Sequence, residues 1–129
     1  MMGRGVDASG SARAPTLLIV DDHDRFRAFA RSLLAAEGFV VVGEARDGAS
    51  AIRAAEELEP DVVLLDVMLP DLDGFAVCAR LAEAASPPAV VLTSTRDASA
   101  YQRRLGQSPA RGFIAKSELT GAALSALVA

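Results

Sequence analysis

Short apolar runs alternate with stretches of helical periodicity along the chain. Runs of four or five aliphatic and β-branched residues are typical of strands buried on both faces of a sheet. They predict strands at residues 16–20, 39–42, 62–65, 89–92 and 112–115. Between them, apolar residues recur every three or four positions, as from Phe26 to Leu34, which predicts amphipathic helices. The helices are expected at about residues 24–37, 48–58, 75–85, 98–105 and from Thr120 onward.

Residues typical of turns separate these elements. Gly38 is expected to end the first helix and Pro60 to close the second. The segment 68–74 (MLPDLDG) has the Pro, Asp and Gly content of a loop. Thr120 is predicted to cap the last helix, with Leu119 and Leu124 forming a hydrophobic staple around the cap.

Five strands that alternate with five helices predict a parallel sheet covered by helices on both faces. For 129 residues we expect one α/β domain with the flavodoxin-like (βα)5 doubly wound fold and strand order 2-1-3-4-5. Residues 1–15 carry Gly, Ser, Ala and Arg without periodicity and are expected to form a disordered leader before a domain at 16–129.

Composition narrows the functional classes. The net charge of −4 argues against nucleic acid or an anionic membrane as the main partner. The single cysteine cannot form an internal disulfide, and no apolar run approaches the ~18 residues of a membrane span. The N-terminus lacks the apolar core of a secretory signal. A cytoplasmic location is therefore expected.

Polar residues whose side chains could bind a ligand or react with it follow four of the predicted strands: Asp21-Asp22, Asp66, Thr93 and Lys116. In an open α/β sheet, ligands bind at the carboxyl ends of strands where the strand order reverses, here between the first and third strands. Three carboxylates converging there repel one another, so a cation is expected among them, and oxygen ligands favour Mg²⁺ over Zn²⁺.

Lys116 is the only lysine among 13 cationic residues, which suggests that it does something arginine cannot. An ammonium and the Thr93 hydroxyl beside an Mg²⁺ site suit phosphoryl transfer, in which the protein mainly positions groups and neutralises charge. Asp66 is then the expected nucleophile and would form an aspartyl phosphate.

The segments VDD (20–22), LLDVMLPDLDG (64–74), LTS (92–94) and GFIAK (112–116), in this order, resemble the receiver domain of two-component response regulators. His23 after the acidic pair and the run GFIAKSEL are similar to the subfamily that usually carries a C-terminal helix-turn-helix. The chain ends with the predicted last helix, so no DNA-binding domain is expected within it.

The resemblance implies a role for each site residue, listed here as Asp66 (phosphoacceptor), Asp22 (direct Mg²⁺ ligand), Asp21 (largely through water), Met68 (backbone carbonyl ligand), Thr93 and Lys116 (phosphoryl contacts) and Phe113 (switch aromatic). It also implies a sensor histidine kinase as partner. Phosphorylation would move Thr93 and Phe113 inward and change the face built from the fourth helix, the fifth strand and the last helix. A homodimer formed through that face is possible.

One position departs from the family pattern. The lysine is usually followed by a cis proline, whereas Ser117 follows Lys116 here. A cis bond before a residue other than proline costs about 2.5–4 kcal/mol. Either that strain is retained, or the bond is trans and the last helix begins differently.

Other functions remain to be weighed. A phosphatase using Asp22 and Asp24 would need a longer chain with a cap over the substrate, and a degenerate receiver would lack part of the site. Flavin binding would need a phosphate-cradling loop where Asp21 and Asp22 stand. We therefore expect a signalling switch with at most slow self-dephosphorylation and no enzyme activity of its own.

The remaining conspicuous residues have structural interpretations. His23 is expected to be exposed without a role, and Cys78 to pack in the interior. Asp71 and Asp73 are expected to be turn residues, and Tyr101 to lie on the surface.

Overall fold

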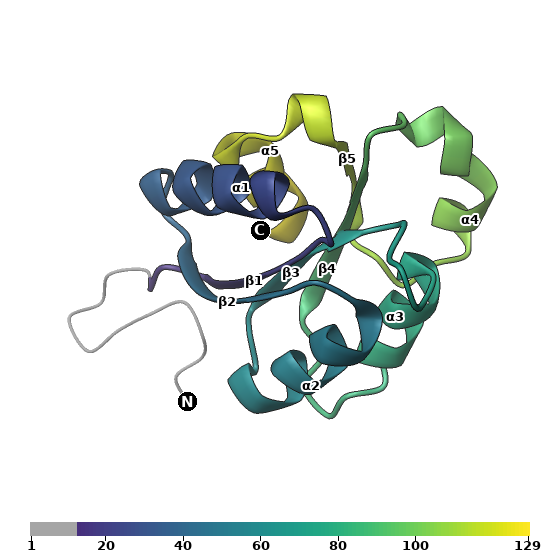
Figure 1. The fold of residues 1–129 in the computed structure, drawn as a ribbon, viewed down its shortest axis with the longest axis horizontal. Helices are drawn as coiled ribbons and strands as arrows, with labels where there is room; N and C mark the ends of the chain where they lie inside the picture. The colour runs from purple at the N-terminus through teal and green to yellow at the C-terminus, as the bar shows by residue number, and fades with distance from the viewer. Residues whose placement is uncertain (1–12) are drawn as a thin grey trace.

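A computed structural model describes residues 13–129 as one five-stranded parallel sheet with strand order β2-β1-β3-β4-β5 (Figure 1). The strands are β1 (Thr16–Val20), β2 (Val40–Ala45), β3 (Val62–Asp66), β4 (Ala89–Ser94) and β5 (Gly112–Ala115). The helices are α1 (Asp24–Ala36), α2 (Gly48–Leu58), α3 (Gly74–Leu81), α4 (Gln102–Gly106) and α5 (Gly121–Val128). The predicted fold and strand order are confirmed.

Helices cover both faces of the sheet and bury two apolar layers (Figure 1). One layer joins the sheet to α1 and α5 through residues such as Leu34 and Leu124. The other joins it to α2 and α3 through residues such as Ala51 and Val77. All five residues of β3 are buried, as expected for a central strand without a solvent face.

The predicted ends of the helices correspond to specific capping contacts. Gly38 has φ of 105° and ends α1, while the N–H of Phe39 donates to the Leu34 carbonyl at 3.0 Å. The Thr120 hydroxyl accepts from the N–H of Ala123 at 3.0 Å, which makes Thr120 the N-cap of α5 as predicted. Leu119 and Leu124 are buried in the same layer, in agreement with the predicted staple.

The region of the fourth helix differs from the prediction. It begins as a 3₁₀ turn, Ala98–Tyr101, and only then continues as α4. Tyr101 is buried, with 9% of its surface exposed, so the prediction of a surface position was wrong. Its ring packs between those of Phe75 and Phe113, with centroids 5.9 and 5.8 Å away. A single-sequence pattern does not reveal this, because the tyrosine is buried by residues from α3 and β5.

The Lys116–Ser117 bond is trans. A short 3₁₀ turn, Lys116–Glu118, follows β5 directly and precedes α5, so the chain enters the last helix through an additional turn. Of the two arrangements that the sequence left open, the structure therefore has the unstrained one.

Most of the expected leader, residues 1–12, lies outside the described residues. The Pro15 carbonyl accepts from the N–H of Val40 at 2.9 Å, so backbone pairing with β2 begins one residue before Thr16. Among residues 13–129, no helix has the length and apolar character needed to cross a bilayer.

Candidate functional site

The carboxyl ends of β1, β3 and β5 bring four ionisable side chains together. Asp21 and Asp22 follow β1, Asp66 ends β3, and Lys116 follows β5. Because β1 and β3 are neighbours at the point where the strand order reverses, the carboxylates meet at one edge of the sheet. Asp21 is fully buried and Asp66 is 3% exposed, which is unusual for acidic residues.

The carboxylates of Asp21, Asp22 and Asp66 form an acidic cluster with His23, whose ligand atoms all lie within 4.8 Å of one another. Oδ2 of Asp21 and Oδ1 of Asp22 are buried, and each lies beside an ionisable nitrogen: Nζ of Lys116 is 2.6 Å from the first, and Nδ1 of His23 is 3.1 Å from the second. Buried carboxylate oxygens this close are costly unless a cation neutralises them. An oxygen-rich set that remains partly open to water fits Mg²⁺.

Lys116 supplies the positive charge of the site. Its Nζ lies 2.6 Å from Oδ2 of Asp21 and 3.4 Å from Oδ2 of Asp66. The same ammonium sits 4.5 Å from the ring centroid of Phe26, on α1. Only 11% of the lysine side chain is exposed, so its charge acts in a largely desolvated slot.

Burial raises the pKa of the Asp66 carboxyl to about 6, and the neighbouring Asp21 carboxylate adds to the rise. The N–H of Met68, which donates to Oδ1 of Asp66 at 3.1 Å, and the Lys116 ammonium lower that pKa in part. A carboxylate that titrates this close to neutral pH retains more basicity than an exposed one, which suits a nucleophile.

The carboxylates open into a pocket of about 290 Å³ at the surface. It is lined by Asp22, His23, Asp66, Met68, Leu69, Pro70, Ser94, Thr95 and Lys116. Met68 stands at its rim with a largely exposed side chain. The pocket therefore places a small ligand against Asp66, with carboxylates on one side, Lys116 on another and hydroxyls at the end of β4.

Two of the predicted site residues, Thr93 and Phe113, do not line this pocket. Thr93 pairs with Asp66 in the sheet, but it is fully buried, and its hydroxyl donates to the Ile114 carbonyl at 2.6 Å. It does not line the pocket. Phe113 is half-buried and its ring packs on that of Tyr101. The proposed roles of Thr93 and Phe113 in switching therefore remain predictions.

His23 contacts the acidic cluster, which the sequence did not predict. Its side chain is exposed as predicted, yet it is not idle, because Nδ1 lies 3.0 Å from Oδ1 of Asp21 and 3.1 Å from Oδ1 of Asp22. Ser94 was also missed as a pocket residue. In the sequence, His23 directly follows the acidic pair and Ser94 directly follows Thr93. These positions could have marked both residues as candidates, but the sequence alone does not tell which way a side chain points.

The loop between β3 and α3 is built from capping contacts. The Asp71 carboxylate accepts from the backbone N–H groups of Gly48 and Ala49 at 2.7 and 3.0 Å, and these bonds lower its pKa. Asp73 caps α3 by accepting from the N–H of Phe75 at 2.7 Å. Both aspartates are turn residues, as predicted.

Gly74 lies where the loop passes close to β3. A Cβ at this position would lie 2.6 Å from the Val67 Cα, beside the backbone carbonyl of Asp66. Glycine therefore allows the loop to close over the strand that carries Asp66. Beyond the loop, Cys78 is buried on α3, as expected, and burial raises the pKa of its thiol.

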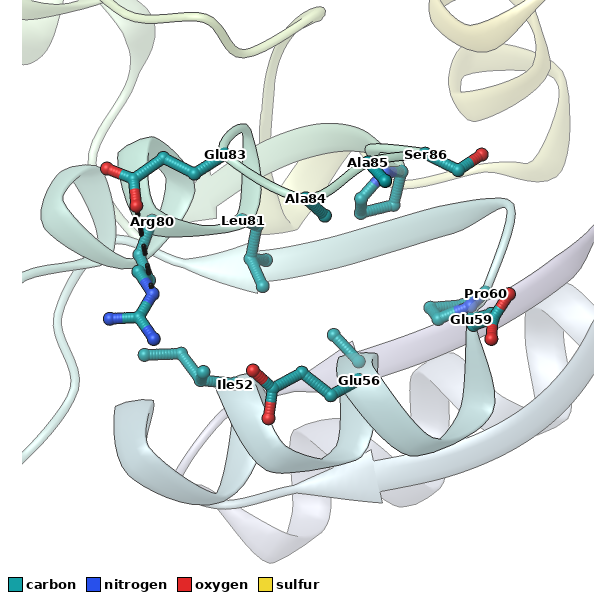
Figure 2. Close-up of a pocket in the computed structure, with 12 residues that line it drawn as sticks. Ile52, Glu56, Glu59, Pro60, Arg80, Leu81, Glu83, Ala84, Ala85 and Ser86 are labelled. Carbon is teal, nitrogen blue, oxygen red and sulfur yellow. Dashed lines mark ion pairs between the residues drawn. The ribbon is translucent and has the colours of Figure 1, made fainter.

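A larger cavity of about 500 Å³ lies at the other end of the sheet, between α2 and the turn after α3. Figure 2 shows Ile52 and Leu81 in this cavity, with Glu56 and the ion-paired Arg80 and Glu83 around it. Among residues 13–129, the four-residue cluster around Asp66 is the single group whose ligand atoms are close enough to hold a metal ion. The residues that could hold a metal ion therefore lie at the smaller pocket and not at the larger cavity.

Comparisons with known proteins agree on one family. The model of the response regulator receiver domain matches residues 17–128. The transcription regulator of virulence factors BvgA from Bordetella pertussis is 39% identical over 102 residues, which cover 79% of this chain and 49% of that protein. The chain thus spans about half the length of this curated relative.

Solved structures give the same result. The signal receiver domain of the response regulator NarL from Mycobacterium tuberculosis has a TM-score of 0.79 and 33% identity, covering 89% of this chain and 97% of that chain. A crystal structure described as the CheX-CheY-BeF3-Mg+2 complex from Borrelia burgdorferi has a TM-score of 0.76 and 26% identity, covering 97% of this chain and 93% of that chain.

Proposed function

The chain belongs to the response regulator receiver family, and we propose that it is a signalling switch phosphorylated on Asp66 in the presence of Mg²⁺. The observation that carries this proposal is the position of Asp66. Its buried carboxylate lies close to two further carboxylates, which need a cation to neutralise them. It also lies 3.4 Å from the ammonium of Lys116. This arrangement suits a group that must accept a dianionic phosphoryl unit.

Mg²⁺ would be held by the carboxylates of Asp21, Asp22 and Asp66, with the backbone carbonyl of Met68 as a further ligand. The close approach of these three carboxylates, with Asp21 and Asp66 buried, supports this assignment. When bound, Mg²⁺ supplies charge neutralisation for the carboxylates and for the incoming phosphoryl oxygens. The CheY complex with BeF3 and Mg²⁺ supports the same choice of metal.

Asp66 acts as the nucleophile. One of its carboxylate oxygens forms the new bond to phosphorus, while the bond from phosphorus to the donor breaks and the donor keeps that electron pair. Lys116 neutralises charge on the transferred group, for which a compact ammonium on a flexible stem is suited. The pKa of about 6 keeps Asp66 largely ionised at pH 7, even without a metal ion.

The physiological donor we propose is a phosphohistidine on a sensor histidine kinase. The expected output is a change in the face formed by α4, β5 and α5, through which a homodimer is one further proposal. The chain itself is proposed to be no enzyme beyond slow self-dephosphorylation, to act in the cytoplasm, and to bind neither nucleic acid nor membrane.

Incubation with Mg²⁺ and acetyl phosphate, followed by intact-protein mass spectrometry, tests the proposal. We expect the mass of one added phosphoryl group, mapped to Asp66 after borohydride trapping and digestion. Phosphate on Asp22 would instead favour phosphatase-type chemistry. No mass gain with either acetyl phosphate or a phosphorylated kinase would indicate a degenerate receiver that binds partners without phosphorylation.

A further inference from the structure

An arginine on α1, which the sequence pattern did not single out, holds the backbone of the acidic pair. Nη1 of Arg27 donates to the backbone carbonyl of Asp21 at 2.5 Å. Only 14% of the Arg27 side chain is exposed, and arginine is rarely buried to this extent unless its charge is paired. The guanidinium is therefore part of the structure that carries Asp21 and Asp22.

Two carboxylates from different elements orient this guanidinium. Nε of Arg27 donates to Oε1 of Glu44, near the end of β2, at 3.1 Å, and Nη2 donates to Oδ1 of Asp24 at 2.5 Å. The second oxygen of Glu44 accepts from Arg31 at 2.7 Å. Because the guanidinium is a rigid planar fork, these contacts also fix the direction of the N–H that reaches Asp21.

The carbonyl that Arg27 binds belongs to the peptide group that joins Asp21 to Asp22. This group is planar, so its orientation sets the directions in which both side chains leave the backbone. The N–H of Asp21 donates to the Ala45 carbonyl at 3.0 Å, so both polar backbone groups of this residue are held. His23, the N-cap of α1, makes no capping hydrogen bond with its side chain, which leaves a larger part to Arg27 in fixing this loop.

The charge of Arg27 does not explain its place beside a cation site. A positive charge close to the carboxylates repels a metal ion and by itself weakens metal binding. Fixing the carboxylates has the opposite effect on affinity. The two roles therefore predict changes of opposite sign when the arginine is removed.

We propose that Arg27 is a positioning residue for the Mg²⁺ site, which sets Asp21 and Asp22 in the geometry that binds the ion. The inference rests on the proposed function and adds a residue that couples the metal site to α1 and to the edge strand β2. Mg²⁺ requires near-ideal octahedral geometry, so its affinity depends on ligand placement. Loss of a group that orients metal ligands lowers metal affinity about ten- to hundred-fold.

The experiment measures the dissociation constant of Mg²⁺ from amide chemical shifts during a titration. Arg27→Gln should raise this constant about ten- to hundred-fold. Arg27→Lys keeps the charge but lacks the fork, and it should fall between Arg27→Gln and the wild type. The amide of Asp22, which shares a peptide group with the Asp21 carbonyl, should shift in Arg27→Gln before any Mg²⁺ is added.

Arg31→Gln is the matched control. It removes the same charge from the same helix and from the same partner, Glu44, but Arg31 has no contact with Asp21. Its Mg²⁺ affinity should equal or exceed that of the wild type. Melting temperatures measured without Mg²⁺ show how far each variant is destabilised, and titrations well below them keep unfolded protein out of the comparison.

A second measurement uses beryllofluoride, a non-covalent stand-in for the phosphoryl group, followed by fluorine NMR. At Mg²⁺ concentrations that saturate each variant, Arg27→Gln should bind it as the wild type does, because Arg27 contacts neither Asp66 nor Lys116. Mg²⁺ affinity in Arg27→Gln at or above the wild-type level, or an equal loss in Arg31→Gln, would overturn the inference. Absence of Mg²⁺ binding and of phosphorylation in the wild type would instead overturn the proposed function.

Discussion

Lys116 lies closer to Asp21 than to Asp66: its Nζ is 2.6 Å from Oδ2 of Asp21 and 3.4 Å from Oδ2 of Asp66. Asp21 is fully buried, so this ion pair supplies the neutralisation that a buried carboxylate needs. A cation bound by the carboxylates would take over that task. We then expect Lys116 to be released toward the phosphoryl group on Asp66.

The first prediction concerns Mg²⁺. Mg²⁺ should stabilise the wild type, by about 2.7 kcal/mol when its concentration is one hundred times the dissociation constant. Asp22→Asn should remove most of this gain, because one of the carboxylates of the cluster is lost. Thermal unfolding across an Mg²⁺ titration measures it, with the exposed Glu56→Gln as a charge-matched control. A melting temperature independent of Mg²⁺ in the wild type would contradict the site.

The second prediction identifies the phosphoacceptor. Asp66→Asn should show no mass gain from acetyl phosphate, because an amide is not a nucleophile for this transfer. Asp97→Asn, which changes an exposed capping aspartate, should be phosphorylated like the wild type. Full phosphorylation of Asp66→Asn would place the nucleophile elsewhere, with Asp22 the first position to examine.

The third prediction is a pH dependence of stability in metal-free buffer. The pKa of Asp66 is about 6 in the folded protein and near 3.8 when unfolded, so ionisation of Asp66 opposes folding. This penalty is absent below about pH 4, grows between pH 4 and 6 and is complete above pH 6, where it is on the order of 3 kcal/mol. The free energy of unfolding of the wild type should therefore fall relative to Asp66→Asn over that range.

Urea denaturation of both proteins at intervals from pH 4 to 7.5 provides the comparison. Saturating Mg²⁺ should reduce the difference between the two proteins above pH 6, since a bound cation stabilises the ionised carboxylate. If the two curves run parallel from pH 4 to 7.5 without metal, Asp66 does not titrate as described.

The fourth prediction concerns the single lysine. Lys116→Arg should still be phosphorylated, at a lower level than the wild type, because Asp66 and the metal site remain. Phosphorylation of this variant should change the face formed by α4, β5 and α5 only weakly. The slot over the Phe26 ring leaves 11% of the lysine side chain exposed, and a planar guanidinium has a different shape and hydrogen-bonding geometry. Amide chemical shifts over α4, β5 and α5, with and without beryllofluoride, should change less than in the wild type.

Arg111→Lys provides the opposite exchange at an exposed residue before β5 and should respond as the wild type does. Responses of equal size in Lys116→Arg and the wild type would show that any cation suffices. The presence of a single lysine would then be a matter of composition only.

Much of the architecture follows from local pattern. The strand β5 and the helix α2 have the predicted bounds, because apolar runs and helical spacing are read over a few neighbouring residues. The bounds of α3 were less accurate: it ends at Leu81 rather than near Ala85, and turns follow it. Helix ends depend on a few backbone bonds, which the apolar pattern does not resolve.

The sequence by itself determined the fold class, the strand order and the meeting of Asp21, Asp22, Asp66 and Lys116, because the carboxyl ends of parallel strands share one edge of the sheet. Only the tertiary structure decided side-chain direction: that Thr93 bonds Ile114 while Ser94 lines the pocket, and that Tyr101 is buried. The physical reason is how far apart in the sequence the interacting residues are. Strand position is set by residues nearby in sequence, whereas a hydroxyl is oriented by partners that belong to other elements.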